Sequence, residues 1–156
     1  MLFYSYLPVF FSILTSILAA EGSSCNVNVH NTTEVAWQVT RCAYCYMGPH
    51  DDGRTKANDV LWINYNGTLI NGSLFDSSYT PEKPWPAGDP FNFTLGAKQV
   101  ITGFDAGLYD MCPRERRRLT IPPKYAYGEK GVPDVIPPNS TLVFEVELMK
   151  VVKVGN

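Results

Sequence analysis

Residues Ile121 to Leu148 read I-P-P-K-Y-A-Y-G-E-K-G-V-P-D-V-I-P-P-N-S-T-L-V-F-E-V-E-L. The last part, Thr141–Leu148, alternates apolar residues with other residues, and this pattern predicts a half-buried strand. Its apolar face is expected to hold Leu142, Phe144, Val146 and Leu148. Before it, glycines and prolines punctuate a loop that begins at Pro122-Pro123 and carries aromatic side chains. The stretch therefore predicts one strand ending at Ile121, a stiff loop, and a second strand.

Length and composition limit the remaining possibilities. The chain has 156 residues, which suits one domain with a modest core. It holds 13 Lys and Arg against 15 Asp and Glu, so nothing in the charge suggests nucleic acid as a partner. Twelve prolines and twelve glycines, with several short apolar alternations, favour a fold dominated by a sheet.

The N-terminus is expected to be a secretory signal peptide over residues 1–20, with cleavage after Ala20 or Gly22. An apolar core is followed by small residues, although no Lys or Arg precedes that core. A signal anchor is the alternative; Pro8 and the small-residue exit favour cleavage. We therefore expect no membrane attachment after cleavage, and a final location either in the lumen of the endoplasmic reticulum or outside the cell.

Cysteines and glycosylation motifs agree with export. Four cysteines behind a signal peptide favour two disulfides, with three possible pairings. Cys42 and Cys45 form a C-x-x-C, but without a second such motif zinc is a poor alternative, and a short Cys42–Cys45 bridge stays open. No other metal-ligand pattern and no phosphate loop appears, so no cofactor is expected. Five N-x-Ser/Thr sequons predict N-glycosylation at Asn31, Asn66, Asn71, Asn92 and Asn139.

Further elements follow from local patterns. Strands are expected at Val35–Tyr46, Val60–Gly67, Phe91–Leu95 and Glu115–Ile121, with an Asn71-Gly72 hairpin turn and a helix over Gln99–Met111. The arginines at 114 and 116–118 are expected on a solvated strand face. These elements predict an α+β fold: an antiparallel half-barrel sheet of five or six strands wrapped over one short amphipathic helix.

The run A-Y-G-E-K-G-V-P-x-x-I-P-P-x-x-T-L-V-F-E-V-E-L, with Y-N-G-T-L-x-N-G-S-x-F-D-S-S at residues 65–78, resembles the FKBP-type peptidyl-prolyl cis–trans isomerases. The resemblance covers residues 48–152; residues 21–47 form a lead-in with the first strand, and 153–156 a tail. A proline-rich insertion after Asp76 lies outside the family pattern. The resemblance implies the same sheet-over-helix fold and binding of proline-containing polypeptides and of macrolides such as tacrolimus and rapamycin.

The resemblance also implies a pocket. Its members are Tyr65, Phe75, Asp76, Phe91, Val100, Ile101, Phe104, Tyr127, Ile136 and Phe144. Phe104 would form the floor under a proline ring, Tyr127 and the Ile101 N–H would donate hydrogen bonds, and Asp76 would hold the wall through Tyr65. Phe93 is expected in the core instead.

Two departures concern the chemistry of this pocket: Phe104 replaces the tryptophan that is usual in the family, and Val132 replaces a histidine common before the loop proline. The implied function is isomerisation of X–Pro bonds during folding in the secretory pathway. A weakly active or inactive proline-binding chaperone or adaptor, and an interaction protein that faces a host or matrix, are the alternatives.

The resemblance to secretory members also implies a Cys45–Cys112 disulfide, which leaves Cys25–Cys42 as the second bridge.

Overall fold

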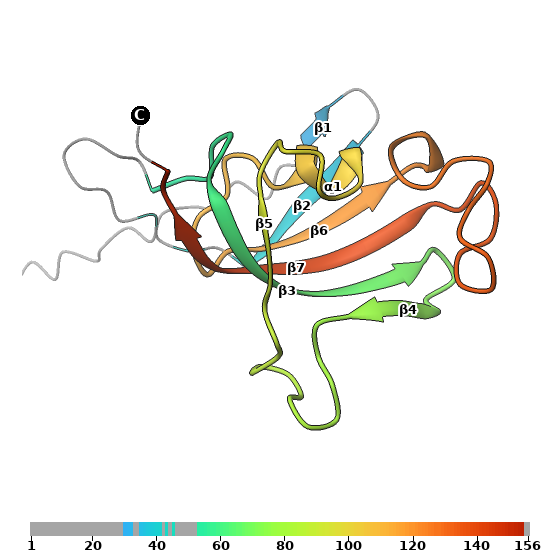
Figure 1. Cartoon of the computed structure of the whole chain (residues 1–156), viewed down its shortest axis with the longest axis horizontal. Helices are drawn as coiled ribbons and strands as arrows, with labels where there is room; N and C mark the ends of the chain where they lie inside the picture. Colours follow the sequence, from blue (N-terminus) through green and yellow to red (C-terminus); the bar gives the residue numbers. More distant parts are fainter. Residues whose placement is uncertain (1–29, 33–34, 42, 44, 46–52, 155–156) are drawn as a thin grey trace, which may run out of the picture.

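The computed structural model describes residues 30–32, 35–41, 43, 45 and 53–154. They form one open antiparallel sheet in the order β1-β2-β6-β7-β3-β4, and β5 also pairs with β3 (Figure 1). The α+β fold is therefore confirmed. The strands are β1 His30–Thr32, β2 Val35–Arg41, β3 Val60–Leu69, β4 Leu74–Ser77, β5 Phe91–Thr94, β6 Arg116–Ile121 and β7 Leu142–Val152; the helices are α1 Thr102–Gly107 and the short 3-10 helix η1 Pro123–Tyr125.

The helix α1 lies close against β6. Gly103 and Gly107 make this approach possible, because a Cβ at Gly107 would meet the Leu119 side chain at 2.7 Å and one at Gly103 would meet Ile121. Only six residues are helical, fewer than the sequence predicts: the backbone of Ile101 is extended (ψ 146°), and the helix ends before Leu108 (φ −108°, ψ 3°). The predicted apolar face is nevertheless buried: Phe104, Leu108 and Met111 all belong to the core.

The strand β7 is buried on more than its predicted face. Leu142, Phe144, Val146 and Leu148 are buried as expected, but Val143 and Glu147 are buried too. Arg41 and Arg116 cover Glu147, at 2.5 and 2.7 Å from its carboxylate oxygens. These ion pairs bury a carboxylate on the face that the sequence pattern assigns to solvent.

The prediction of a solvated arginine face is wrong for Arg117, whose side chain is only 2 % exposed. Arg117 points to the same side of β6 as Leu119 and Ile121, and it ends at the C-terminal end of α1. Its guanidinium pairs with Glu115 at 2.6 Å and donates to three backbone carbonyl oxygens at 2.7–2.9 Å, those of Gly107, Tyr109 and Asp110. It also lies over the Trp37 ring, 4.0 Å from the ring centroid.

The predicted hairpin between β3 and β4 is confirmed, with a loop of three residues rather than two. The Leu69 N–H donates to the Ser73 carbonyl oxygen, and the Gly72 N–H donates to that of Leu69. Gly72 has a φ of +90°, which suits the left-handed residue of a three-residue hairpin loop.

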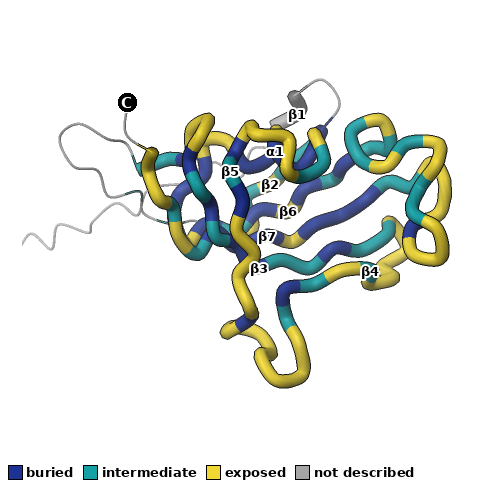
Figure 2. Tube along the Cα trace, viewed as in Figure 1, coloured by how far each residue is buried: buried dark blue, intermediate teal, exposed yellow. Residues whose placement is uncertain are grey.

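The proline-rich insertion leaves the sheet between β4 and β5. Both strands pair with the same edge of β3, β4 at Asn66–Thr68 and β5 at Val60–Ile63. In Figure 2 most of the insertion is exposed, in contrast to the buried strands behind it. Its base is anchored on Asn64, which is 1 % exposed, donates to the Ala87 carbonyl oxygen and accepts from the Ser78 hydroxyl.

A disulfide joins Cys45 to Cys112, the pair that the family resemblance implies, with a Cα–Cα distance of 5.3 Å. The bridge ties the segment after β2 to the chain between α1 and β6. Cys25, Cys42 and the predicted signal peptide lie outside the described residues. In the part of the chain that is described, no helix is long and apolar enough to cross a membrane.

Candidate active site

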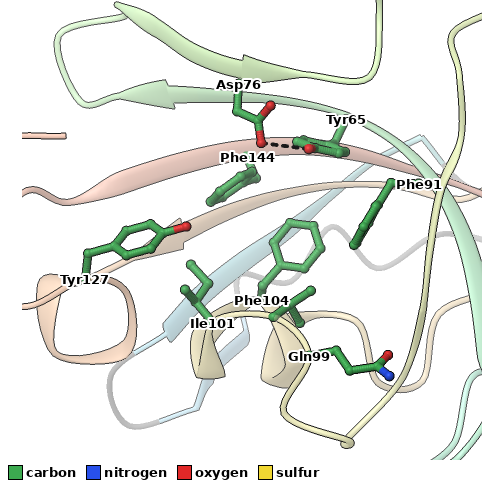
Figure 3. A pocket seen from close by; sticks show the side chains of 9 residues that line it. Tyr65, Asp76, Phe91, Gln99, Ile101, Phe104, Tyr127 and Phe144 are labelled. Carbon is green, nitrogen blue, oxygen red and sulfur yellow. Dashed lines mark hydrogen bonds between the residues drawn. The ribbon is translucent and has the colours of Figure 1, made fainter. Parts of the chain in front are cut away.

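A cavity of about 240 Å³ opens between α1 and the concave face of the sheet. Residues of β3, β4, β5 and β7, of α1 and the segment directly before it, and of the loop after η1 converge on it (Figure 3). The lining residues are Tyr65, Asp76, Phe91, Gln99, Val100, Ile101, Phe104, Tyr127 and Phe144. We call this cavity the aromatic cup.

Phe104 forms the base of the aromatic cup. Its ring is only 4 % exposed and lies 4.9 Å from that of Phe144, 6.1 Å from Tyr65 and 6.1 Å from Phe93 between ring centroids. The pairs with Phe144 and Tyr65 meet edge to face, an arrangement that aromatic rings prefer, and the pair with Phe93 is tilted. Phe91, 43 % exposed, stands at the outer wall and stacks on the buried Phe93. Phe93 is in the core, as predicted.

A tyrosine–carboxylate pair forms one wall. The Tyr65 hydroxyl donates to Asp76 Oδ2 at 2.7 Å, and the Ser77 N–H donates to Asp76 Oδ1 at 2.9 Å. Burial and the bond to Asp76 raise the pKa of the Tyr65 phenol well above its ordinary value, so Tyr65 remains a neutral donor. Within the described residues no Lys, Arg or His pairs with Asp76.

Two donors at the opposite rim have no partner among the described residues. Tyr127 is 41 % exposed, and Figure 3 shows its hydroxyl directed over the aromatic cup. The N–H of Ile101 precedes α1, while its carbonyl oxygen accepts from the N–H groups of Phe104 and Asp105. The start of α1 therefore fixes the Ile101 N–H, and both groups can donate to a carbonyl oxygen of a ligand.

The structure brings together eight of the ten predicted pocket residues. Phe75 packs behind the wall, 5.6 Å from Phe144 between ring centroids, and Ile136 is 4 % exposed inside the loop before β7, so neither lines the cavity. Sequence reasoning missed Gln99, whose side-chain oxygen accepts the Thr94 N–H at 2.8 Å. The only sequence feature that could have indicated Gln99 as a pocket residue is its position directly before Val100 and Ile101. No metal-binding cluster occurs among the described residues.

Comparison with known proteins agrees with this geometry. The family model described as FKBP-type peptidyl-prolyl cis-trans isomerase matches residues 52–149. The chain is 51 % identical over 102 residues to FK506-binding protein 1 of Saccharomyces cerevisiae, covering 64 % of this chain and 84 % of that protein. It is 48 % identical over 98 residues to peptidyl-prolyl cis-trans isomerase FKBP2 of Homo sapiens, covering 63 % of this chain and 65 % of that protein.

Among solved structures, FkpA from Escherichia coli matches with a TM-score of 0.64 and 38 % identity; the match covers 80 % of this chain but only about half, 51 %, of FkpA. The family match spans well over half of the chain, and it contains every residue that lines the aromatic cup. The chain therefore belongs to the FKBP-type peptidyl-prolyl cis–trans isomerases.

Proposed function

We propose that this isomerase binds X–Pro segments of polypeptides in the aromatic cup and speeds their cis–trans exchange during folding in the secretory pathway. The observation that carries the proposal is the convergence of a buried aromatic floor with two free hydrogen-bond donors and a wall in which the neutral Tyr65 phenol is bonded to the Asp76 carboxylate. We further propose that macrolides such as tacrolimus and rapamycin compete for the same cavity.

The chemistry needs no cofactor or nucleophile. Rotation about the amide has a barrier of about 18–20 kcal/mol, because twisting the bond breaks its resonance. The twisted amide has a less polarised carbonyl than the planar amide, so an apolar, water-poor cavity favours it over the ground state. Hydrogen bonds that hold the flanking carbonyl groups add the orientation that the twist requires.

The residues of the aromatic cup have distinct roles in this mechanism. The proline ring lies on Phe104, between the rings of Tyr65 and Phe144. The Ile101 N–H and the Tyr127 hydroxyl each donate to a substrate carbonyl oxygen. Asp76 keeps Tyr65 in place and presents a carboxylate beside the twisting bond, while Val100 and Phe91 exclude water. Phe75 and Ile136 support the rings from behind, which changes their proposed role from contact to packing.

The secretory location rests on other features: the signal-like residues 1–20, the Cys45–Cys112 disulfide and the five sequons. Disulfides of this kind persist in oxidising compartments. Among the sequons, Asn71 and Asn139 lie in exposed turns, and we propose these two as the glycosylated sites; Asn66 is half-buried and accepts the Ser77 hydroxyl.

The test is cis–trans exchange of a proline peptide, measured by NMR with the mature chain. Turnover above the uncatalysed rate, competed by rapamycin, supports isomerase function. Tyr127→Phe removes one proposed hydrogen bond and should lower kcat/KM about twofold to tenfold. Asp76→Ala should lower it as well. Binding of the peptide without faster exchange would instead support a proline-binding chaperone or adaptor.

A further inference from the structure

A second cavity opens beside the aromatic cup, where the proline-rich insertion leaves β4 and returns to β5. Tyr65 and Phe91 line both cavities. The far side of the second cavity comes from the insertion and its ends, through Thr80, Asp89 and Pro90. Because the two cavities share these walls, a peptide with its proline in the aromatic cup can place a neighbouring residue in the second cavity.

Backbone hydrogen bonds fix the position of this second cavity. The Asp89 N–H donates to the Ser78 carbonyl oxygen at 2.8 Å, which closes the base of the insertion. Ser78 in turn donates its N–H to the Tyr65 carbonyl oxygen at 3.0 Å and accepts the Tyr65 N–H on its hydroxyl at 2.9 Å. Asp89 is therefore held beside Tyr65 independently of the exposed tip of the insertion.

The charge at this junction is negative. Asp76 lines the aromatic cup and Asp89 lines the second cavity, and among the described residues no Lys or Arg lines either one. Lys83 pairs with Asp89 at 2.9 Å, but the two side chains are 52 % and 70 % exposed. An ion pair this exposed is weak and easily exchanged, so a cationic side chain of a bound peptide can take the place of Lys83.

We propose that the second cavity is a subsite for a lysine or arginine within two residues of the substrate proline, with Asp89 as the specificity-determining residue. The inference rests on the proposed function, because it extends the same peptide path. Both oxygens of Asp76 already accept hydrogen bonds, from the Tyr65 hydroxyl and the Ser77 N–H, which leaves Asp89 as the carboxylate that selects the charge of the neighbouring residue. The insertion thus adds a preference for cationic neighbours to the binding of X–Pro segments by the aromatic cup.

The test compares peptides that differ only in one residue beside the proline: Lys, Leu or Glu, placed before it in one series and after it in another. We expect kcat/KM to fall in the order Lys, Leu, Glu in at least one series, with about threefold to tenfold between Lys and Glu at low salt. The ratio should shrink at about 0.5 M salt, because screening weakens exposed charges.

Variants identify the residue responsible. Asp89→Asn should bring the Lys-to-Glu ratio close to one, and Asp89→Lys should reverse it. Glu82→Gln is the matched control, since Glu82 is an exposed carboxylate of the same insertion that does not line the cavity; it should keep the wild-type ratio. Equal kcat/KM for all peptides, or a Lys preference that survives Asp89→Asn, would overturn the inference.

The two proposals fail in different ways. If no peptide turned over, the proposed function would be wrong, and the same peptides would then be ranked by dissociation constant from NMR titration. The order Lys, Leu, Glu in binding would still support the subsite, and equal binding would overturn it. Turnover that is equal for all peptides contradicts the subsite alone.

Discussion

Removing the buried guanidinium of Arg117 should destabilise the domain strongly. Arg117→Met leaves the Glu115 carboxylate buried without its countercharge, and it leaves the carbonyl oxygens of Gly107, Tyr109 and Asp110 without their donor. Breaking a buried ion pair from one side costs about 3–5 kcal/mol. For a urea dependence of about 1.5 kcal/mol per molar, the unfolding midpoint should fall by about 2–3 M.

A double variant separates the charge effect from the loss of packing. With Glu115→Gln added, no uncompensated charge remains, and the new amide oxygen can still accept the Cys112 N–H that Glu115 accepts at 2.9 Å. The double variant should therefore be more stable than Arg117→Met alone. The measurement is urea unfolding followed by circular dichroism, with coupling calculated from the four proteins of the cycle.

Arg118→Met is the matched control on the same strand. Arg118 is 53 % exposed and lies 3.3 Å from the exposed Glu145, so its loss should cost less than about 1 kcal/mol. If Arg117→Met also cost less than about 1 kcal/mol, Arg117 would not stabilise the end of α1. If the effects of the Arg117 and Glu115 substitutions were simply additive, the two side chains would not form a stabilising pair.

Three further outcomes are expected. Phe104→Trp should keep or raise turnover in the exchange assay, whereas Phe104→Ala should cost about 3–5 kcal/mol in urea unfolding, because the ring is buried. Burial alone would raise the pKa of Glu147, but hydrogen bonds and charges from Arg116 and Arg41 lower it on balance. The stabilisation that ionised Glu147 contributes is therefore complete above about pH 4.5 and is lost as the pH falls through the lower folded pKa. In Glu147→Gln, the free energy of unfolding should therefore fall less steeply as the pH is lowered through this range. Reducing the Cys45–Cys112 bridge, which closes a loop of 67 residues, should lower stability by about 4 kcal/mol; an unchanged unfolding midpoint in reductant would contradict this.

The resemblance to the family predicted the residues of the aromatic cup, and strand parity agrees with it for the side chains that lie on strands. Tyr65 lies in phase with Leu61 and Ile63 on β3, and Phe144 lies in phase with Leu142 and Val146 on β7, so both point to the helix side. Strand parity has no bearing on Tyr127 and Ile101, because their places depend on chain geometry, and for them the resemblance to a family with the same loop is the whole basis of the prediction.

Buried charges were missed for a physical reason. Arg117 is two and four residues before Leu119 and Ile121, so on β6 its side chain points to the same, buried face. An arginine is rarely buried, however, unless hydrogen-bond and charge partners surround its guanidinium. Those partners are carbonyl oxygens at the end of α1, and no sequence pattern reports that they converge there. Glu147 on β7 is likewise buried by Arg116 of the adjacent strand β6 and by Arg41 of β2, which is 106 positions away in the chain.

Because β4 and β5 pair with the same edge of β3, a foreign peptide segment can be inserted in the chain between them. Ser78 and Asp89 are joined by one backbone hydrogen bond, so the chain between them begins and ends at almost the same point. Loops closed in this way can change in length at small entropic cost. A foreign peptide could replace residues 79–86 and be displayed on a rigid scaffold, provided that Ala87 and Gly88 stay, because Asn64 needs the Ala87 carbonyl oxygen and a Cβ at Gly88 would meet its side chain at 2.5 Å.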